Sequence, residues 1–381
     1  MKQNKAIRQV ILCRHSKTML TDIFLNRYLD VPLWEEFGRR ESRLLVQCFR
    51  IVSEQVLPYY KDKKPRTGAP ELWSNLNKTL AMELGLKELS PSVYGFYNVQ
   101  KQWISGSWPP ITVCENFMCA EYDGSISPDE FVKERISFIE LAFRHRGEQV
   151  AAVNANQEQG ILDAKRVRGD FAARLANKSR RPPDENKLKR DQAEAADQVR
   201  MGIQLENQIF DAYCHELNTR LRQAGTNLDY HNGFIQISAD DATQAEIETP
   251  FWGLVSDPMW ANVDHDMKEA IDLRDSGGRD PSWYAAKALE STIKIISDNK
   301  GWTRGNEKGA INYIDNLRSK ANSEFINAWE RESMAEYFSK VRNPFGHGPG
   351  SDKMPSLSSP QTDWAIEFSM IWIRNLIRRL R

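Results

Sequence analysis

One long stretch rich in alanine, glutamine and charged residues constrains the fold most, because that composition favours long helices. Residues 147–225 hold few large apolar side chains and are cut by Arg180–Pro183. Proline ends a helix, so the stretch predicts two long antiparallel helices. In the second of them Ile203, Phe210 and Leu217 lie seven residues apart, which predicts that its later half packs against another part of the protein.

The earlier half of that second helix, around Lys187, Lys189 and Arg190, has little to bury. It is either a solvated arm or a surface that grips RNA or a partner. The chain is also longer than one hydrophobic core usually supports. We therefore expect an N-terminal, mainly helical domain over 1–146, a charged helical arm over 147–225 and a helical domain over 226–381.

Local signals place further elements on both sides of the predicted arm. Apolar spacing predicts helices over 41–56 and 71–84, and Ser127–Glu130 has the cap, proline and glutamate of a helix start. The aromatic, proline-broken stretch 94–122 predicts a packed but irregular region. An Asn-Gly turn between short apolar runs predicts a small β-hairpin over 228–237.

Five helices are predicted after this hairpin, so we expect a mainly α-helical protein with a C-terminal helical bundle. Their expected ranges are 259–273, 281–296, 310–317, 323–342 and 363–380. The last helix is apolar on most sides and is therefore expected to be central to a bundle or to a subunit contact.

Composition limits the functions that are open to the chain. The 52 basic and 52 acidic side chains balance, so any RNA site must be local. The five cysteines are scattered and odd in number, which argues against a disulfide framework and favours the cytoplasm. No apolar run is long enough for a membrane span or a signal segment, and no Cys or His pairs have the spacing of a metal site.

One segment combines the residue types that metal-independent RNA cleavage needs. Residues 341–350 contain Arg342, Asn343 and His347 together with Pro344 and three glycines, so we expect the helix to end and the chain to turn back tightly. Attack by the RNA's own 2′-hydroxyl needs a base, a proton for the leaving oxygen and a cation near the phosphorus. An imidazole and an arginine supply these groups without a metal.

The spacing between an arginine and a histidine is by itself weak support for a catalytic site. Arg8 and His15 have a similar spacing, but they lie in an apolar run and no asparagine follows the arginine. A purely structural Arg-His turn therefore stays open. Phosphate-binding, dinucleotide-binding, nucleophile-elbow and zinc-protease signatures are absent from the sequence.

The motif resembles the Arg-x4–6-His signature of the HEPN superfamily (higher eukaryotes and prokaryotes nucleotide-binding), with Arg342, Asn343 and His347 as the matching residues. Three upstream stretches are similar to AbiJ-type abortive infection proteins. They are Leu217 through Asp229–Phe234, the helix before Asp280–Pro281, and Ala288–Thr292. The similarity covers roughly residues 205–381, and the amino-terminal part matches no family pattern known to us.

This resemblance implies a metal-independent endoribonuclease of a bacterial antiphage abortive-infection system that works without a cofactor. His347 would act as base or acid, Arg342 would steady the phosphorane, and Asn343 would position the phosphate or the histidine. Glu290 either orients Arg342 or His347 across the bundle or is a surface glutamate on its helix. Two alternatives remain: a HEPN-like module that binds RNA or nucleotide without cutting, and a scaffold protein that uses its helical arm.

The resemblance also implies a homodimer in which two motifs face each other. The last helix, with Trp364, Phe368 and Trp372, is the expected contact. Its basic end either complements the helix C-terminus or lines an RNA phosphate track. The arginines concerned are Arg374, Arg378 and Arg379. A phage-derived trigger or a cognate inhibitor is the further partner that such a system implies, and no membrane is involved.

Overall fold

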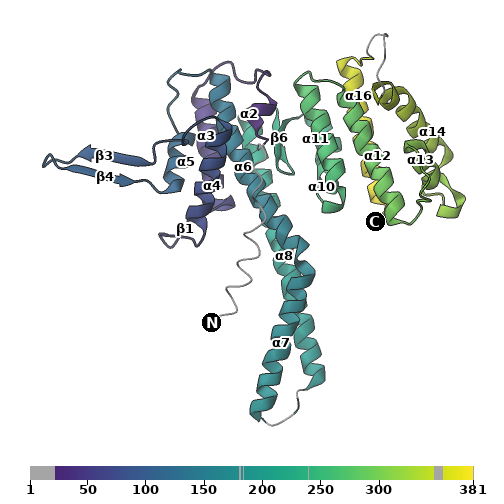
Figure 1. The fold of residues 1–381 in the computed structure, drawn as a ribbon, viewed down its shortest axis with the longest axis horizontal. Helices are drawn as coiled ribbons and strands as arrows, with labels where there is room; N and C mark the ends of the chain where they lie inside the picture. The colour runs from purple at the N-terminus through teal and green to yellow at the C-terminus, as the bar shows by residue number, and fades with distance from the viewer. Residues whose placement is uncertain (1–21, 180–181, 183, 239, 347–354, 381) are drawn as a thin grey trace.

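The computed structural model describes residues 22–179, 182, 184–238, 240–346 and 355–380. Helices dominate, and the strands form only small two-stranded antiparallel hairpins, so the predicted mainly α-helical fold is confirmed. Two hydrophobic clusters divide the body. The first extends from Ile23 to Ile237 and the second from Ile247 to Leu380. In Figure 1 they lie side by side along the long axis, and a helical arm extends away from the first.

Helices near the amino-terminus build the first cluster around α6. They are α2 (Phe24–Arg27), α3 (Arg39–Arg50) with the π-helical turn η1 (Ile51–Val56), α4 (Ala69–Glu83), α5 (Pro110–Met118) and α6 (Pro128–Ala155). The predictions over 41–56 and 71–84 are confirmed. The predicted start of α6 is also confirmed, because Ser127 Oγ accepts a hydrogen bond from the Glu130 N–H at 3.1 Å.

The prediction of a packed, irregular region over 94–122 is wrong. Its first part is a β-hairpin of β3 (Val93–Tyr97) and β4 (Trp103–Ser107), and its second part includes α5. The hairpin projects from the first cluster, and the side chains of Phe96, Tyr97 and Trp103 are more than half exposed. Aromatic residues are common in strands as well as in cores, so their number did not distinguish a β-hairpin from a packed irregular region. A shorter hairpin joins β1 (Tyr60–Lys61) to β2 (Lys64–Pro65).

The predicted antiparallel arm is confirmed as α7 (Gln157–Ser179) and α8 (Glu185–Gln223) (Figure 1). Gly160 faces Val199 and Gly169 faces Gln192, which sets the two helices antiparallel. The later half of α8 packs on the first cluster through its buried leucines and partly buried Phe210, as predicted. The basic residues of the earlier half, Lys187, Lys189 and Arg190, are exposed to solvent.

The predicted Asn-Gly hairpin consists of β5 (Leu228–His231) and β6 (Phe234–Ile237), with Tyr230 opposite Ile235. Asn232 and Gly233 both have positive φ, 43° and 93°, as a two-residue hairpin turn requires. The hairpin's buried side chains pack in the first cluster. The change from one cluster to the next therefore falls after Ile237, whereas the sequence places the start of the third region at 226.

The second cluster contains all five helices that were predicted for the C-terminal part. Its elements are α9 (Asp241–Thr243), η2 (Gln244–Glu248), α10 (Thr249–Val255), η3 (Pro258–Trp260), α11 (Ala261–Asp275), α12 (Pro281–Asn299), α13 (Ala310–Arg318), η4 (Lys320–Asn322), α14 (Ala328–Tyr337), η5 (Phe338–Arg342), α15 (Asn343–Gly346) and α16 (Ser359–Leu380). Helix α14 begins later than predicted because Asn327 and Glu330 form a capping box at its start. Helix α16 packs on α10, α11 and α12, so its central position is confirmed.

Polar contacts join the two clusters at α11. Arg27 Nε lies 3.3 Å from Asp272 Oδ2, and the Tyr28 hydroxyl donates to Asp272 Oδ1 at 3.1 Å. At the tip of the β5–β6 hairpin, Asn232 Nδ2 donates to Asp264 Oδ1 at 2.8 Å. The N-terminal cluster therefore contacts α11 at two positions along its length.

Candidate active site

Arg342 lies at the end of the π-helical turn η5, and the helix continues into α15. The predicted tight turn directly after Arg342 is therefore wrong for residues 343–346. Pro344 is the second residue of α15 and has no N–H to bond to the preceding turn. A proline also crowds the turn before it, and the wider π turn, in which the Asn343 N–H bonds to the Phe338 carbonyl, provides that space.

Glu290 on α12 holds Arg342 across the bundle. Arg342 Nη2 lies 3.0 Å from Glu290 Oε2, and the two side chains are 29% and 9% exposed. A carboxylate so well covered fixes the direction of the guanidinium better than a surface partner would. The Nε atom of Arg342 is buried and has no hydrogen-bond partner among the described residues. The structure thus brings together two of the predicted site residues, Arg342 and Glu290.

Lys294 is a site residue that the sequence reasoning missed. It lies one helical turn after Glu290 on α12, and its Nζ atom is 2.7 Å from Glu290 Oε1. The i,i+4 spacing of a glutamate and a lysine was the signal that could have found it. Glu290 therefore has a cation on each oxygen, and the local charge of this group of three side chains is positive.

His347 lies outside the described residues, so its place relative to Arg342 is not part of the structure. Asn343 is described and exposed, at the first position of α15. The helix continues through Gly346, one turn beyond Arg342.

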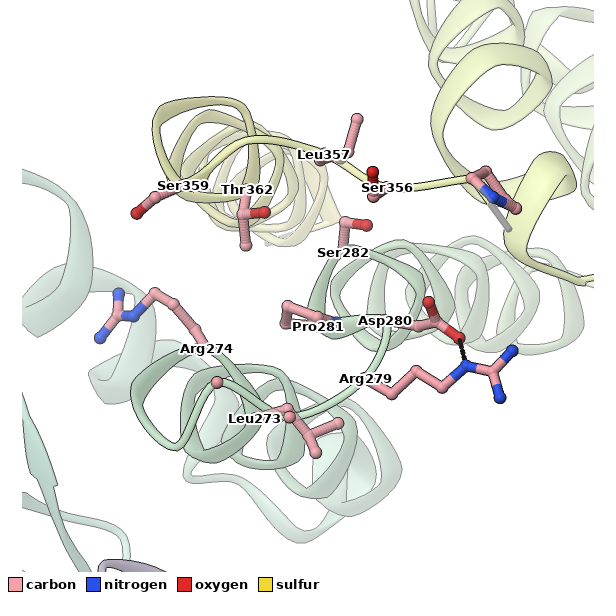
Figure 2. Close-up of a pocket in the computed structure, with 13 residues that line it drawn as sticks. Leu273, Arg274, Arg279, Asp280, Pro281, Ser282, Ser356, Leu357, Ser359 and Thr362 are labelled. Carbon is pink, nitrogen blue, oxygen red and sulfur yellow. Dashed lines mark ion pairs between the residues drawn. The ribbon is translucent and has the colours of Figure 1, made fainter. Parts of the chain in front are cut away.

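A pocket of about 330 Å³ lies between the connection from α11 to α12 and residues 355–362 (Figure 2). It is lined by residues 273, 274, 277–282, 355–357, 359 and 362. Ser282 at the start of α12 and Thr362 near the start of α16 lie on facing walls, and Ser356 and Ser359 add further hydroxyls. These groups can hydrogen-bond to sugar or phosphate oxygens. Along α12, Ser282 is about 12 Å from Glu290.

Both arginines at this pocket have protein partners. Arg274 Nε lies 2.8 Å from Asp275 Oδ1, and Arg274 Nη2 donates to the Ile237 carbonyl at 3.0 Å. Arg279 Nε is 3.4 Å from Asp280 Oδ2, the ion pair drawn in Figure 2. The hydroxyl groups are therefore the more available ligand-binding groups of the pocket.

Two of the three candidate arginines on α16 have contacts within the described protein, and the third is exposed. Arg374 donates to the Glu246 carbonyl. Arg379 forms an ion pair with Glu330 at 2.5 Å and donates to the Phe325 carbonyl at 3.1 Å. Arg378 is exposed and has no ion pair among the described residues. Of these three arginines, Arg378 alone combines exposure with the lack of a described partner, so a phosphate track along α16 has little support.

The aromatic residues expected at a dimer contact form a continuous row on α14 and α16. Phe368 stacks on Tyr337 with ring centroids 4.5 Å apart, and it also contacts Trp364 and Trp372. Trp372 is buried, whereas Trp364 is 52% exposed, and Trp329 on α14 is 63% exposed. The row therefore has a buried side and an open side.

The described part of the chain places no three His, Cys, Asp or Glu side chains together as a metal-ion site. Its cysteines, Cys48, Cys114, Cys119 and Cys214, are free thiols. Among the helices of the same residues, none has the length and apolarity to cross a membrane.

Comparison with known proteins gives one match. The family model described as AbiJ N-terminal domain 4 matches residues 22–253. This range holds the first cluster, the arm and the β5–β6 hairpin. Most of it is the amino-terminal part, for which the sequence reasoning found no family. It overlaps the predicted range of resemblance only over 205–253. No curated protein and no solved structure matches the chain.

Proposed function

The chain belongs to the AbiJ N-terminal domain 4 family, and from that premise we propose that it is a metal-independent endoribonuclease of an abortive-infection system. The AbiJ-family domain suggests the antiphage system. The nuclease part of the proposal depends on Arg342, Asn343 and His347, which lie beyond the matched residues.

The Arg342–Glu290 ion pair is the observation that carries this proposal. An arginine fixed by a carboxylate and still 29% exposed can direct its remaining N–H groups to a phosphate. Lys294 on the other oxygen of Glu290 keeps the neighbourhood positive, which favours a polyanionic substrate.

In the proposed reaction the RNA's 2′-oxygen attacks the adjacent phosphorus while His347 takes the 2′-hydroxyl proton. Arg342 compensates the negative charge that builds on the phosphoryl oxygens, and Asn343 orients one of them. The bond from phosphorus to the 5′-oxygen breaks, and that oxygen accepts a proton from an acid. The products are a 2′,3′-cyclic phosphate and a free 5′-hydroxyl.

One histidine cannot both take the first proton and give the second in the same instant. A second copy of the motif, facing the first in a homodimer, would supply the acid. The exposed Trp329 and Trp364 offer an apolar face for such a contact on α14 and α16. We therefore place the dimer contact at this face.

The test uses purified full-length protein, total RNA and EDTA. Wild type should cleave the RNA, and its 5′ fragments should end in a 2′,3′-cyclic phosphate. His347→Ala and Arg342→Ala should lower the rate at least about 100-fold, the usual size of a general acid–base or oxyanion contribution.

A histidine in the same domain provides the matched control. His265 on α11 is exposed, and His265→Ala should keep full activity. Equal RNA survival with wild type and His347→Ala would remove the catalytic claim. RNA that binds to both proteins and stays intact would support the binding module instead. Loss of assembly on deletion of residues 157–200 would support the scaffold.

A further inference from the structure

Four arginines from two elements line one pocket on the first cluster, far from the motif. The pocket has a volume of about 330 Å³. Arg39, Arg40 and Arg43 come from the first turns of α3, and Arg220 comes from the end of α8. The remaining lining residues are Leu44, Gln47, Gln223 and Ala224. No acidic side chain lines this pocket.

Of the acids nearest in sequence on α3 and α8, one caps α3 and the other pairs with Arg220. Glu41 uses its carboxylate to accept the Gly38 N–H at 2.9 Å, as the cap of α3. Glu216 lies 3.2 Å from Arg220. Arg39, Arg40 and Arg43 are exposed and have no ion pair within the described ranges. Three uncompensated guanidinium groups therefore gather at one place in a chain of zero net charge.

The backbone at the end of α8 is shaped to admit one of these arginines. Gly225 has a φ of +65°, and a Cβ atom there would lie 1.6 Å from Arg40 Nη2. Any side chain at this position would displace the Arg40 guanidinium from the end of α8. The glycine thus leaves room for Arg40 at the end of α8, and Arg40 and Arg220 line the same pocket although they are distant in the sequence.

Like charges gathered without a counter-charge raise the free energy of the free protein and favour an anion that several of them can contact. Guanidinium groups form paired hydrogen bonds with phosphate oxygens, and the glutamines add neutral donors. We propose that this pocket, the arginine pocket, binds the phosphate backbone of the RNA substrate.

This inference rests on the proposed function and extends it, because it names a substrate-holding surface apart from the reacting groups. In Figure 1, α3 lies in the first cluster, and α14, which leads to Arg342, lies at the opposite end of the long axis. The arginine pocket therefore contributes to RNA binding and not to the chemical step. An RNA long enough to reach both regions should be the preferred substrate.

The binding test uses full-length protein with Arg342→Ala, so that the RNA stays intact, and a fluorescent single-stranded RNA followed by anisotropy. Arg39→Gln with Arg43→Gln should weaken binding and flatten its salt dependence. Each lost phosphate contact lowers the slope of log K against log salt by about 0.7, so the pair should lower it by about 1.4.

A matched pair of substitutions controls for net charge. Arg50 lies on the same helix α3 and pairs with Glu54, and Arg66 is exposed outside the arginine pocket. Arg50→Gln with Arg66→Gln removes the same charge and should leave the salt slope unchanged. Equal slopes for the two double variants would overturn the proposal. Circular dichroism melting checks that both variants fold.

Competition distinguishes RNA from a free phosphate compound. ATP and inorganic phosphate, each at the same concentration of phosphate groups as the RNA, should fail to displace the labelled strand. Displacement by ATP would reassign the arginine pocket to a nucleotide. In cleavage assays with Arg342 intact, the Arg39 and Arg43 variant should raise KM and keep kcat. The binding test does not depend on cleavage, so it tests the arginine pocket even if wild type cleaves no RNA.

Discussion

Replacing Glu140 with glutamine should destabilise the first cluster more than any single surface change. The Glu140 side chain is buried on α6 and accepts hydrogen bonds from three residues. Arg27 Nη2 donates at 2.6 Å, Arg144 Nη2 at 2.8 Å and the Ile235 N–H at 2.7 Å. Its carboxylate therefore joins α2, α6 and β6.

The size of the effect follows from the burial of the partners. The Arg27 side chain is 7% exposed and that of Arg144 is 18% exposed, so neither regains full hydration when the carboxylate is lost. Breaking a buried ion pair on one side costs about 3–5 kcal/mol. Glutamine keeps one acceptor oxygen and Arg27 keeps Asp272 at 3.3 Å, so we expect the lower end, about 3 kcal/mol.

The assay is urea denaturation followed by circular dichroism, with the free energy of unfolding taken from midpoint and slope. The control is Glu54→Gln, which removes an i,i+4 pair with Arg50 whose side chains are 56% and 67% exposed. That control should not shift the midpoint measurably. A Glu140→Gln midpoint equal to that of the control would refute the reasoning from burial.

Two further substitutions test local features of the β5–β6 region. Burial raises the pKa of Asp229 to about 6, so the folded state holds a proton that the unfolded chain releases near pH 4. The contribution of Asp229 to stability is therefore lowest above pH 6 and improves as the pH falls towards 4. At pH 8, Asp229→Asn should be more stable than wild type by up to about 3 kcal/mol, and below pH 4 the two should be equally stable. Denaturation measured at several pH values checks this. A difference in stability that stays constant from pH 4 to pH 8 would contradict the raised pKa. Gly233→Ala should cost about 1–2 kcal/mol in thermal unfolding, because φ is +93° and the new Cβ would lie 3.2 Å from Arg144 Cγ. The helical Gly253 has open space around it, so Gly253→Ala should instead leave stability unchanged or raise it by up to about 1 kcal/mol, and the same sign for both glycines would be inconsistent with this account.

The elements that the sequence predicts well are those whose signals are local. The cap at Ser127, the prolines between α7 and α8, and the Asn232-Gly233 turn each act within a few residues. Tertiary packing changed none of them. The β3–β4 hairpin was missed because its aromatic side chains lie on an exposed projection, where the usual link between aromatic residues and a core does not hold.

The candidate site was predictable only in part, for a similar reason. A contact of Glu290 with Arg342 or His347 was one of the two readings of that glutamate, and the structure shows the ion pair with Arg342. The π turn before Pro344 was not predicted, because proline usually ends a helix and no local signal marks a helix that continues after a wider turn. The arginine pocket was hidden because Arg220 meets Arg40 through packing, and a net charge of zero conceals a local excess.

The contacts of α11 show how the family domain connects to the motif. The match to the AbiJ domain ends at residue 253, inside α10, and the matched part holds α11 through Arg27 and Tyr28. Helix α11 in turn packs along α12, where Lys287 lies 2.8 Å from Asp266. Because α12 also carries Glu290, packed helices join the matched domain to the carboxylate that holds Arg342. A continuous path of packed elements therefore runs from the domain that defines the family to the Arg342–Glu290 ion pair.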